Sequence, residues 1–336
     1  MHWCDTSNDA DTKGEIFEIN YNMNKRLILM CIALATSIIV NAQQIIFTPQ
    51  WTPQSQFAGY YAALEKGFYA EAGLDVSFTH PTKSYSSINM LLDGISNIIT
   101  SELIQAMTAT DKNIRLVNLL QTTQHSTLVL IAREKNIKQM SHLKGCRIGT
   151  WKVGFSEIPS MIDKEQHLNI EWIKFINPLN LYISGAIDAT LVKSYNEQIL
   201  FSMSGITPGS ILKFSEMGFD FPEDGLYVTE EYYRQNTEQC RKFAEASRKG
   251  WEWVRNNRKE ALDIVMKYVK AENVPTNIYN QRIMLDAILQ VQEDVKGETP
   301  SYKLSKEAFN NLNKTLIKYG YISKPVEYER FTGGKL

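Results

Sequence analysis

The sequence predicts an α/β fold of two lobes with a ligand cleft between them. Strand-like apolar runs alternate with helical patterns from residue 45 to residue 195, which is the βαβα order typical of a parallel sheet. A second series of this kind begins near residue 147. The 336 residues exceed the usual single-domain size, yet no Pro-, Gly- or Ser-rich linker interrupts the chain after residue 43. Two lobes joined by short crossovers therefore fit better than two separate domains.

The first series supplies the elements of one lobe. Residues 45–49 (IIFTP) are the first predicted strand, and the helix after it runs from about Gly59 to Gly73, a residue type that favours a helix end. A predicted helix at 86–97 lies between two further strands. The remaining predicted strands of this series are 74–80, 98–100, 114–120 and 126–134.

The second series and a helical tail complete the predicted fold. Strands are expected at 147–151, 170–176 and 187–195, with helices at 156–166 and 180–185. The last third of the chain has the apolar periodicity of long amphipathic helices, at 237–257, 259–269, 275–295 and 305–322. We expect one lobe to comprise residues 43–132 and 226–336, and the other to comprise residues 133–225. Ligands of such folds bind between the lobes, at the carboxyl ends of the strands.

The overall charge argues for a small or neutral partner. The chain has 36 Lys and Arg against 37 Asp and Glu, and no basic cluster dominates any segment. This pattern argues against a nucleic-acid-binding surface.

The region at 23–43 (MNKRLILMCIALATSIIVNAQ) has the pattern of a secretory signal peptide. Two cations precede an apolar run, and Val40 and Ala42 are small residues at the cleavage positions. The run is shorter than the roughly twenty apolar residues that a spanning helix needs. We expect initiation at Met23, cleavage after Ala42 and export to the periplasm, with residues 1–22 an extension that is not part of the protein. The alternatives are a buried helix and an uncleaved anchor.

Signals for catalysis or metal binding are weak. The mature chain would keep only Cys146 and Cys240, which form neither a disulfide framework nor a metal-binding spacing. Walker, GxGxxG, HExxH and GxSxG motifs are missing from the sequence. His80 ends a predicted strand with Lys83 nearby and is the best candidate for catalysis, although a polar residue at a strand end is ordinary. We predict no catalytic residue, no metal and no cofactor.

Three stretches that follow predicted strands carry aromatic and amide side chains. They are QWTPQSQFAGYY at 50–61, GTWKVGFSEIP at 149–159 and DATLVKSYNEQ at 188–198. Aromatic rings at two or more strand ends would sandwich a planar ligand, while amide and carboxylate groups would bind its edge. The alternative is that the aromatic residues simply belong to the core.

The candidate ligand-binding residues come mainly from these stretches. Tyr60 and Tyr61 point in different directions on a helix, so at most one of them faces a ligand. The predicted set is Trp51, Gln54, Gln56, Phe57, Tyr60, Glu102, Trp151, Gly154, Tyr195, Asn196, Glu197 and Asp224.

The run WTPQSQFAGYYAALEKGFYAEAGLDV, followed by MLLDG, LKGCRIGTW, YISGAIDATLVKSYNE and DFPEDGLYVTEE, resembles the substrate-binding proteins of the thiamine-precursor group. That group contains bacterial formylaminopyrimidine-binding transport proteins and fungal hydroxymethylpyrimidine phosphate synthases. A wider set includes binders of alkanesulfonates and riboflavin. The likeness spans essentially all of the mature chain. It implies a type II periplasmic-binding-protein fold, whose two lobes close over a ligand.

The resemblance also implies roles for individual residues. The opening motif of the family, W-T-P-N-x-N-H-x-G, is matched by Trp51, Thr52, Pro53 and Gly59. The two Asn and the His of that motif are replaced by Gln54, Gln56 and Phe57. By this resemblance, Trp51 is a stacking platform, Tyr195 stacks on the ligand, and Glu197 reads the edge of a pyrimidine.

Together these features predict a non-catalytic, monomeric binding protein that delivers a planar heterocycle, a pyrimidine precursor of thiamine, to an ABC permease. The alternatives are a synthase that consumes pyridoxal phosphate and histidine, and a sensory module that acts with a separate signalling protein. The fungal synthases carry a cysteine-rich, iron-associated motif and a Lys/His pair that holds the pyridoxal group. This chain has no cysteine cluster, and His80 precedes Lys83 in the wrong order, which argues against a synthase.

Overall fold

The computed structural model describes residue 1 and residues 44–336, except 83–84, 153, 176–177, 294–299 and 335. The predicted signal peptide, its cleavage site and the extension before it therefore lie outside the described residues, as does Lys83. Residues from Gln44 onward form a compact unit.

The first of two sheets has the strand order β2-β1-β3-β10-β4. Strands β1, β2 and β3 are parallel, and β10 runs antiparallel to both β3 and β4. The strands are β1 (Ile45–Thr48), β2 (Val76–Phe78), β3 (Ile98–Glu102), β4 (Leu116–Gln121) and β10 (Asp224–Thr229).

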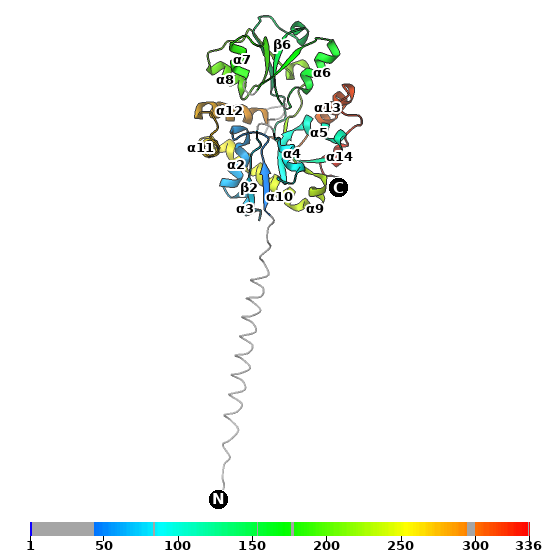
Figure 1. The fold of residues 1–336 in the computed structure, drawn as a ribbon. Coiled ribbons are helices and arrows are strands. Elements are labelled where there is room, and N and C mark those ends of the chain that lie inside the picture. The colour runs from blue at the N-terminus through cyan, green and yellow to red at the C-terminus, as the bar shows by residue number, and fades with distance from the viewer. Residues whose placement is uncertain (2–43, 83–84, 153, 176–177, 294–299, 335) are drawn as a thin grey trace. The chain divides into compact units, whose positions relative to one another are not determined.

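The second sheet has the order β7-β6-β8-β5-β9. Here β6, β7 and β8 are parallel, while β5 runs antiparallel to β8. Figure 1 shows α6 on one side of this sheet and α7 and α8 on the other. The strands are β5 (Leu128–Ala132), β6 (Arg147–Trp151), β7 (Glu171–Phe175), β8 (Ala189–Lys193) and β9 (Ser210–Lys213). The helices are α6 (Glu157–Gln166), α7 (Pro178–Ile183) and α8 (Glu197–Met203).

Each sheet is mixed, although the sequence predicted parallel sheets. Strands β5 and β10 are those by which the chain enters one lobe from the other. Each begins at the cleft edge, where the parallel strands end, so it runs in the opposite direction. Strand β5 also belongs to the second sheet, whereas the predicted boundary assigned residues up to 132 to the first lobe. We therefore propose lobe boundaries within the crossovers at 122–127 and 218–223.

The remaining helices cover the first sheet, and none of the described helices is long and apolar enough to cross a membrane. The predicted helix at 59–73 is divided at Gly67, which adopts a left-handed φ of 80°. The four long helices predicted in the last third of the chain are confirmed. The helices are α2 (Ala58–Glu65), α3 (Phe68–Glu71), α4 (Ser87–Leu92), α5 (Leu103–Thr108), α9 (Glu230–Gln235), α10 (Thr237–Asn256), α11 (Arg258–Ala271), α12 (Ile278–Val291), α13 (Lys306–Lys318) and α14 (Tyr328–Phe331).

Close packing of α2 on α10 fixes the position of the segment between β1 and α2. The buried Trp251 ring of α10 meets Tyr60 of α2 edge-on, with ring centroids 5.7 Å apart. A Cβ atom added at Gly59 would lie 2.2 Å from the Trp251 ring, and one added at Gly250 would lie 2.0 Å from the carbonyl oxygen of Gly59. The two helices can approach this closely only because both positions are glycine.

We expect Gly250→Ala to destabilise the protein by about 1–3 kcal/mol, because the added methyl group overpacks the contact between α2 and α10. Helix propensity alone would predict the opposite sign, since Ala favours a helix over Gly by about 1 kcal/mol. Urea unfolding measures the change, and Lys249→Ala, at an exposed position of the same helix, is the control. A stabilised Gly250→Ala variant would contradict the close approach.

Candidate ligand-binding site

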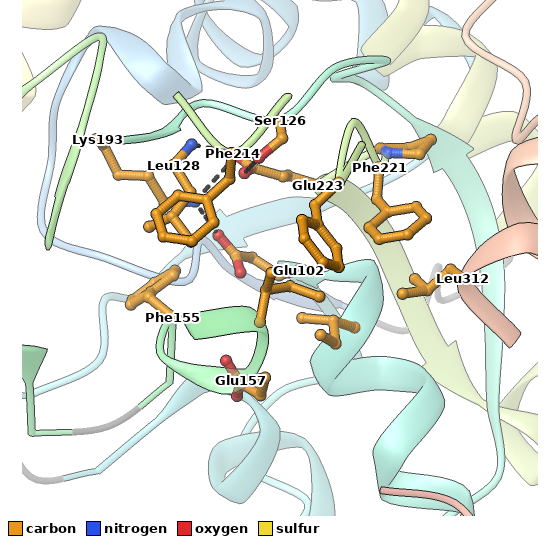
Figure 2. A pocket seen from close by; sticks show the side chains of 14 residues that line it. Glu102, Ser126, Leu128, Phe155, Glu157, Lys193, Phe214, Phe221, Glu223 and Leu312 are labelled. Carbon is orange, nitrogen blue, oxygen red and sulfur yellow. Dashed lines mark hydrogen bonds and ion pairs between the residues drawn. The ribbon is translucent and has the colours of Figure 1, made fainter. Parts of the chain in front are cut away.

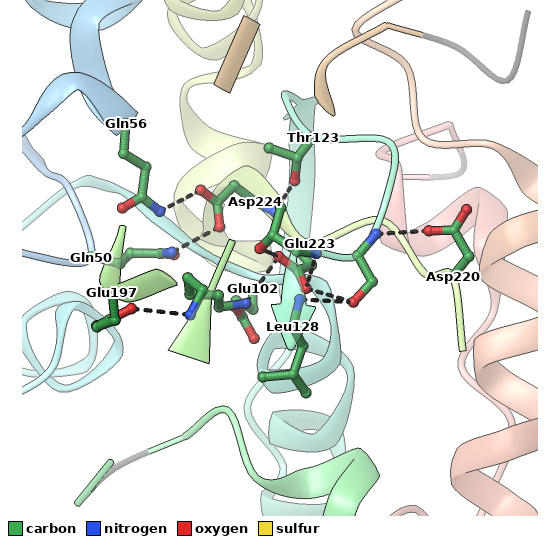
Figure 3. Close-up of polar contacts among 12 residues, drawn as sticks. Gln50, Gln56, Glu102, Thr123, Leu128, Glu197, Asp220, Glu223 and Asp224 are labelled. Carbon is green, nitrogen blue, oxygen red and sulfur yellow. Dashed lines mark hydrogen bonds and ion pairs between the residues drawn. The ribbon is translucent and has the colours of Figure 1, made fainter. Parts of the chain in front are cut away.

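The topology brings charged residues from both sheets to one place. Glu102 ends β3 and is in register with Asp224, the first residue of β10. Lys193 ends β8 and is in register with Leu128, the first residue of β5. Lys193 reaches from the second sheet to Glu102 of the first. Figure 3 shows Glu102 beside Glu223 and Asp224.

A buried ion-pair cluster of Lys193, Glu102 and Glu223 joins the two sheets. The Nζ atom of Lys193 lies 2.5 Å from Oε1 of Glu102 and 2.9 Å from Oε2 of Glu223. Glu223 also accepts hydrogen bonds from the Ser126 hydroxyl and from the N–H of Thr127, both in the other crossover. The cluster therefore ties β3 of one lobe to β8 of the other and fixes both crossovers.

The electrostatics of this cluster keep Lys193 as an ammonium ion. Burial alone would lower the pKa of Lys193, but the carboxylates of Glu102 and Glu223 outweigh it and raise the pKa above its ordinary value. Burial raises the pKa of Glu102 well above its usual range, against the pull of Lys193 and with the help of Glu223 and Asp224. One ammonium faces three carboxyl groups, so the site favours protons or ligand cations over anions.

A cavity beside the cluster, which we call the head compartment, contains seven of the predicted residues. This cavity and the open solvent at its mouth together hold about 310 Å³ of empty space. The predicted residues that line it are Trp51, Gln54, Gln56, Trp151, Tyr195, Asn196 and Glu197. Sequence analysis missed three further lining residues, which are Gln50, Phe155 and Lys193.

Aromatic rings from both lobes line the head compartment. Trp51 comes from the loop after β1 and is 38% exposed, whereas Trp151 and Tyr195 are buried. Trp151 ends β6 and packs edge-on against Phe155, with ring centroids 5.1 Å apart. Rings contributed by both lobes can enclose a planar ligand when the lobes close.

Glu197 is held in place as an acceptor on the compartment wall. It is the first residue of α8, and its Oε1 accepts a hydrogen bond from the Trp151 indole N–H at 3.3 Å. Its Oε2 accepts from the backbone N–H of Lys193 at 3.0 Å. Burial raises the pKa of Glu197. Each carboxylate oxygen can still accept a second hydrogen bond, which a ligand N–H could supply.

Asp224 orients two glutamine amides of the head compartment. Figure 3 shows Gln50 and Gln56 approaching its two carboxylate oxygens. Nε2 of Gln50 donates to Oδ1 at 2.8 Å, and Nε2 of Gln56 donates to Oδ2 at 2.5 Å. With its NH₂ group turned to Asp224, Gln50 is left with a buried Oε1 that accepts no hydrogen bond within the described part of the chain. A buried acceptor without a hydrogen bond raises the free energy of the folded protein, so a ligand that donates a hydrogen bond to this oxygen would remove that penalty.

The ionisation of Asp224 controls this orientation. Burial raises the pKa of Asp224 to about 6, although the hydrogen bond from Gln56 opposes the shift. Above this pH the carboxylate accepts from both glutamines. Below it, the protonated carboxyl can donate to one of them, and that amide must turn its oxygen toward Asp224 to accept.

The other predicted residues lie outside the head compartment. Phe57 and Tyr60, predicted to face the ligand, instead pack in the core of the first lobe and are 1% exposed. Gly154 has a φ of 72° and lies against Gln105 of α5, so it forms a contact between the lobes rather than with the cavity. Asp224 does not line this cavity, but it accepts hydrogen bonds from Gln50 and Gln56, which do. Glu102 lines a second cavity, beyond Phe155 and Lys193.

His80, the candidate for catalysis, lines neither of these two cavities. Its Nε2 is 2.9 Å from the hydroxyl of the buried Tyr61 in the first lobe. Burial lowers the pKa of His80 to about 4, so the imidazole is neutral at physiological pH. It is placed for packing on Tyr61 and not for chemistry on a ligand between the lobes.

Comparison with solved structures agrees with this architecture. The periplasmic aliphatic sulphonate binding protein SsuA from Escherichia coli matches with a TM-score of 0.60 at 13% identity, over 86% of this chain and 91% of that one. A ligand-binding component of an ABC-type import system from Staphylococcus aureus matches with a TM-score of 0.60 at 12% identity, over 86% and 96%. The desulfurization enzyme DSZB also matches, with a TM-score of 0.57 at 13% identity, over 87% and 97%. The predicted type II periplasmic-binding-protein fold is confirmed.

Sequence comparison identifies the family. The family model described as NMT1/THI5 like matches residues 54–261, and the chain belongs to this family. The formylaminopyrimidine-binding protein of Halalkalibacterium halodurans is 22% identical over 83% of this chain and 86% of its own length. The riboflavin-binding protein RibY of Chloroflexus aurantiacus is 20% identical over 86% of this chain and 84% of its own length. The resemblance inferred from the motifs is confirmed.

We expect Lys193→Met to cost about 3–5 kcal/mol of unfolding free energy at pH 7, because it leaves two buried carboxylates without a cation. In the variant, the folded-state pKa of Glu102, already raised by burial, would lie above its unfolded value. Its stability is therefore greatest at acid pH and is lost as the pH rises through that folded value. Urea unfolding between pH 4 and pH 8 measures both effects.

Lys213→Met is the matched control for this substitution. Lys213 pairs with Glu216 at the surface, so its loss should cost less than about 1 kcal/mol at any pH. Equal losses in the two variants, or a loss at position 193 that does not depend on pH, would contradict the role given to the ion-pair cluster.

Proposed function

We propose that this protein is the solute-binding component of an ABC importer and that it captures a planar heterocycle bearing N–H donors, with an aminopyrimidine precursor of thiamine as the leading class. The names of the sequence relatives, the two-lobed fold and the expected export signal support a binding role. The proposal further includes action as a monomer in the periplasm.

One observation carries the choice of ligand class, the buried and unpaired Oε1 of Gln50. Asp224 holds this oxygen in its orientation, and Glu197 adds a second acceptor in the same compartment. A ligand that donates N–H groups along one edge satisfies both acceptors. Its ring can meanwhile stack against Trp51, Trp151 and Tyr195. An exocyclic amino group on an aromatic ring has this pattern of donors.

Charge argues against an anionic ligand. Lys193 is the one cationic residue among the described residues that line the head compartment, and Glu102 and Glu223 already pair with it. A sulfonate or phosphate would therefore meet carboxylates without a cation of its own. We expect this protein to differ in ligand charge from relatives of the same fold whose names specify sulfonates.

The described residues of the site give the synthase alternative no support. The fold alone does not decide the question, since an enzyme shares it. A Schiff base with pyridoxal phosphate needs a lysine that can lose its proton. Lys193, the lysine of the cleft, is held as an ammonium by Glu102 and Glu223, and His80 lies elsewhere.

Thermal unfolding of the purified protein with 4-aminopyrimidines at pH 7.5 tests the proposal. A ligand at one hundred times its Kd should add about 2.7 kcal/mol of stability. Asp224→Asn should weaken binding at least tenfold, because an amide cannot accept from both glutamines and one of them must turn. Wild-type protein at pH 5, below the pKa of about 6 for Asp224, should show a weakening in the same direction.

Asp263→Asn, on the exposed surface of α11, controls for the loss of one negative charge and should bind as the wild type does. Stabilisation by an alkanesulfonate with no effect of any aminopyrimidine would contradict the proposal. So would an Asp224→Asn variant that folds normally and keeps full affinity.

A further inference from the structure

A second cavity, which we call the arm compartment, adjoins the head compartment. The two share Phe155 and Lys193 in their linings, so side chains rather than a sheet separate them. The arm compartment and the open solvent at its mouth together hold about 430 Å³ of empty space. Figure 2 shows it between Lys193 and Phe155 at one end and Phe221 and Leu312 at the other. A ligand that fills the head compartment can therefore extend into this space.

One wall of the arm compartment is aromatic. It is formed by Phe155 and by three phenylalanines that precede β10, Phe214, Phe219 and Phe221. The rings of Phe219 and Phe221 lie 6.4 Å apart, edge to face. Leu312 of α13 closes the same side. Aromatic faces of this kind bind apolar groups, and they also attract cations through their ring quadrupoles.

The other wall is acidic. Glu102, Glu157 and Glu223 line the compartment, with Lys193 as the one cation among its described lining residues. Lys193 pairs with Glu102 and Glu223. Burial raises the pKa of Glu157, the first residue of α6, while the backbone N–H groups of Phe155, Ser156 and Glu157 itself favour its charged form. No side chain of the described residues bonds to this carboxyl, so a ligand cation can pair with it.

The residue between the two compartments is held in a rare backbone conformation. Gly154 and Phe155 have φ values of 72° and 66°, both in the left-handed region. A side chain other than glycine costs roughly 1–2 kcal/mol there. In return, the Phe155 ring lies beneath the ammonium of Lys193, 4.9 Å from its Nζ, and faces both cavities. The Phe155 ring also packs against Trp151, and it separates the two compartments.

We propose that the arm compartment binds a positively charged, apolar arm of the ligand, an ammonium or amidinium group carried on a hydrocarbon or aromatic body. The charge would pair with Glu157 while the body packs against the phenylalanines. A neutral apolar arm would leave the Glu157 carboxyl without a cation, and an anionic arm would meet three carboxyl groups. This inference rests on the proposed function for the head compartment, and it makes the ligand a two-part molecule.

Three probes of one shape but different charge test the inference on the full, purified chain. They are phenethylammonium, 2-phenylethanol and 3-phenylpropionate, measured by isothermal titration at pH 7.5. We expect phenethylammonium to bind, 2-phenylethanol to bind at least fivefold more weakly, and 3-phenylpropionate not to bind. Equal affinity for the three probes, or a preference for the anion, would overturn the inference.

Glu157→Gln should remove the preference for the ammonium over the alcohol and leave aminopyrimidine binding unchanged. Glu165→Gln, at the exposed end of the same helix, should change neither. An unchanged preference in Glu157→Gln would also overturn the inference. The comparison of the three probes on the wild type does not depend on how well the variants fold.

The same titrations separate this inference from the proposed function. Binding of aminopyrimidine without any binding of phenethylammonium would refute the charged arm and leave the proposed function standing. Binding of phenethylammonium without any aminopyrimidine would refute the proposed ligand class and leave the arm compartment standing.

Discussion

The ion pairs of Lys193 with Glu102 and Glu223 are the constraint on which the site depends. An ammonium from one sheet lies between carboxylates from the other sheet and its crossover, away from water. Breaking such a cluster leaves uncompensated buried charge, so the lobes are held in one relative arrangement. That arrangement places Phe155 between two cavities. It also leaves Asp224 beside the cluster, where it accepts hydrogen bonds from Gln50 and Gln56.

Much of the fold was predictable because apolar periodicity and strand-helix alternation are local signals. The strand at 45–48 and the long helix at 237–256 appear where the sequence predicted them. The antiparallel strands β5 and β10 were not predicted as such, because strand direction depends on where the chain crosses between lobes. The run at 126–134 was assigned to the wrong sheet for the same reason. Its composition suits either sheet, and only its partner β8 decides.

The candidate site was predictable where aromatic or acidic residues stand at the ends of strands, because such side chains are typical of ligand binding. Trp51, Trp151, Tyr195 and Glu197 follow strands, and the structure brings them to one cavity. Phe57 and Tyr60 were misassigned because a helix buries one face, and sequence does not show which face when both are aromatic. Lys193 and Glu223 were missed, since a charged residue at a strand end looks like a solvated one until its partner in the other lobe is known. A lysine two residues before Tyr195, at the end of a largely apolar strand, was the available signal.

Native mass spectrometry of the protein purified without refolding tests the central claim most directly, which is that this cleft selects a planar ligand with N–H donors and excludes anions. The account predicts a bound small molecule that absorbs in the ultraviolet, leaves on unfolding, and is neutral or positively charged at pH 7. A co-purified sulfonate, phosphate or other anion would contradict it.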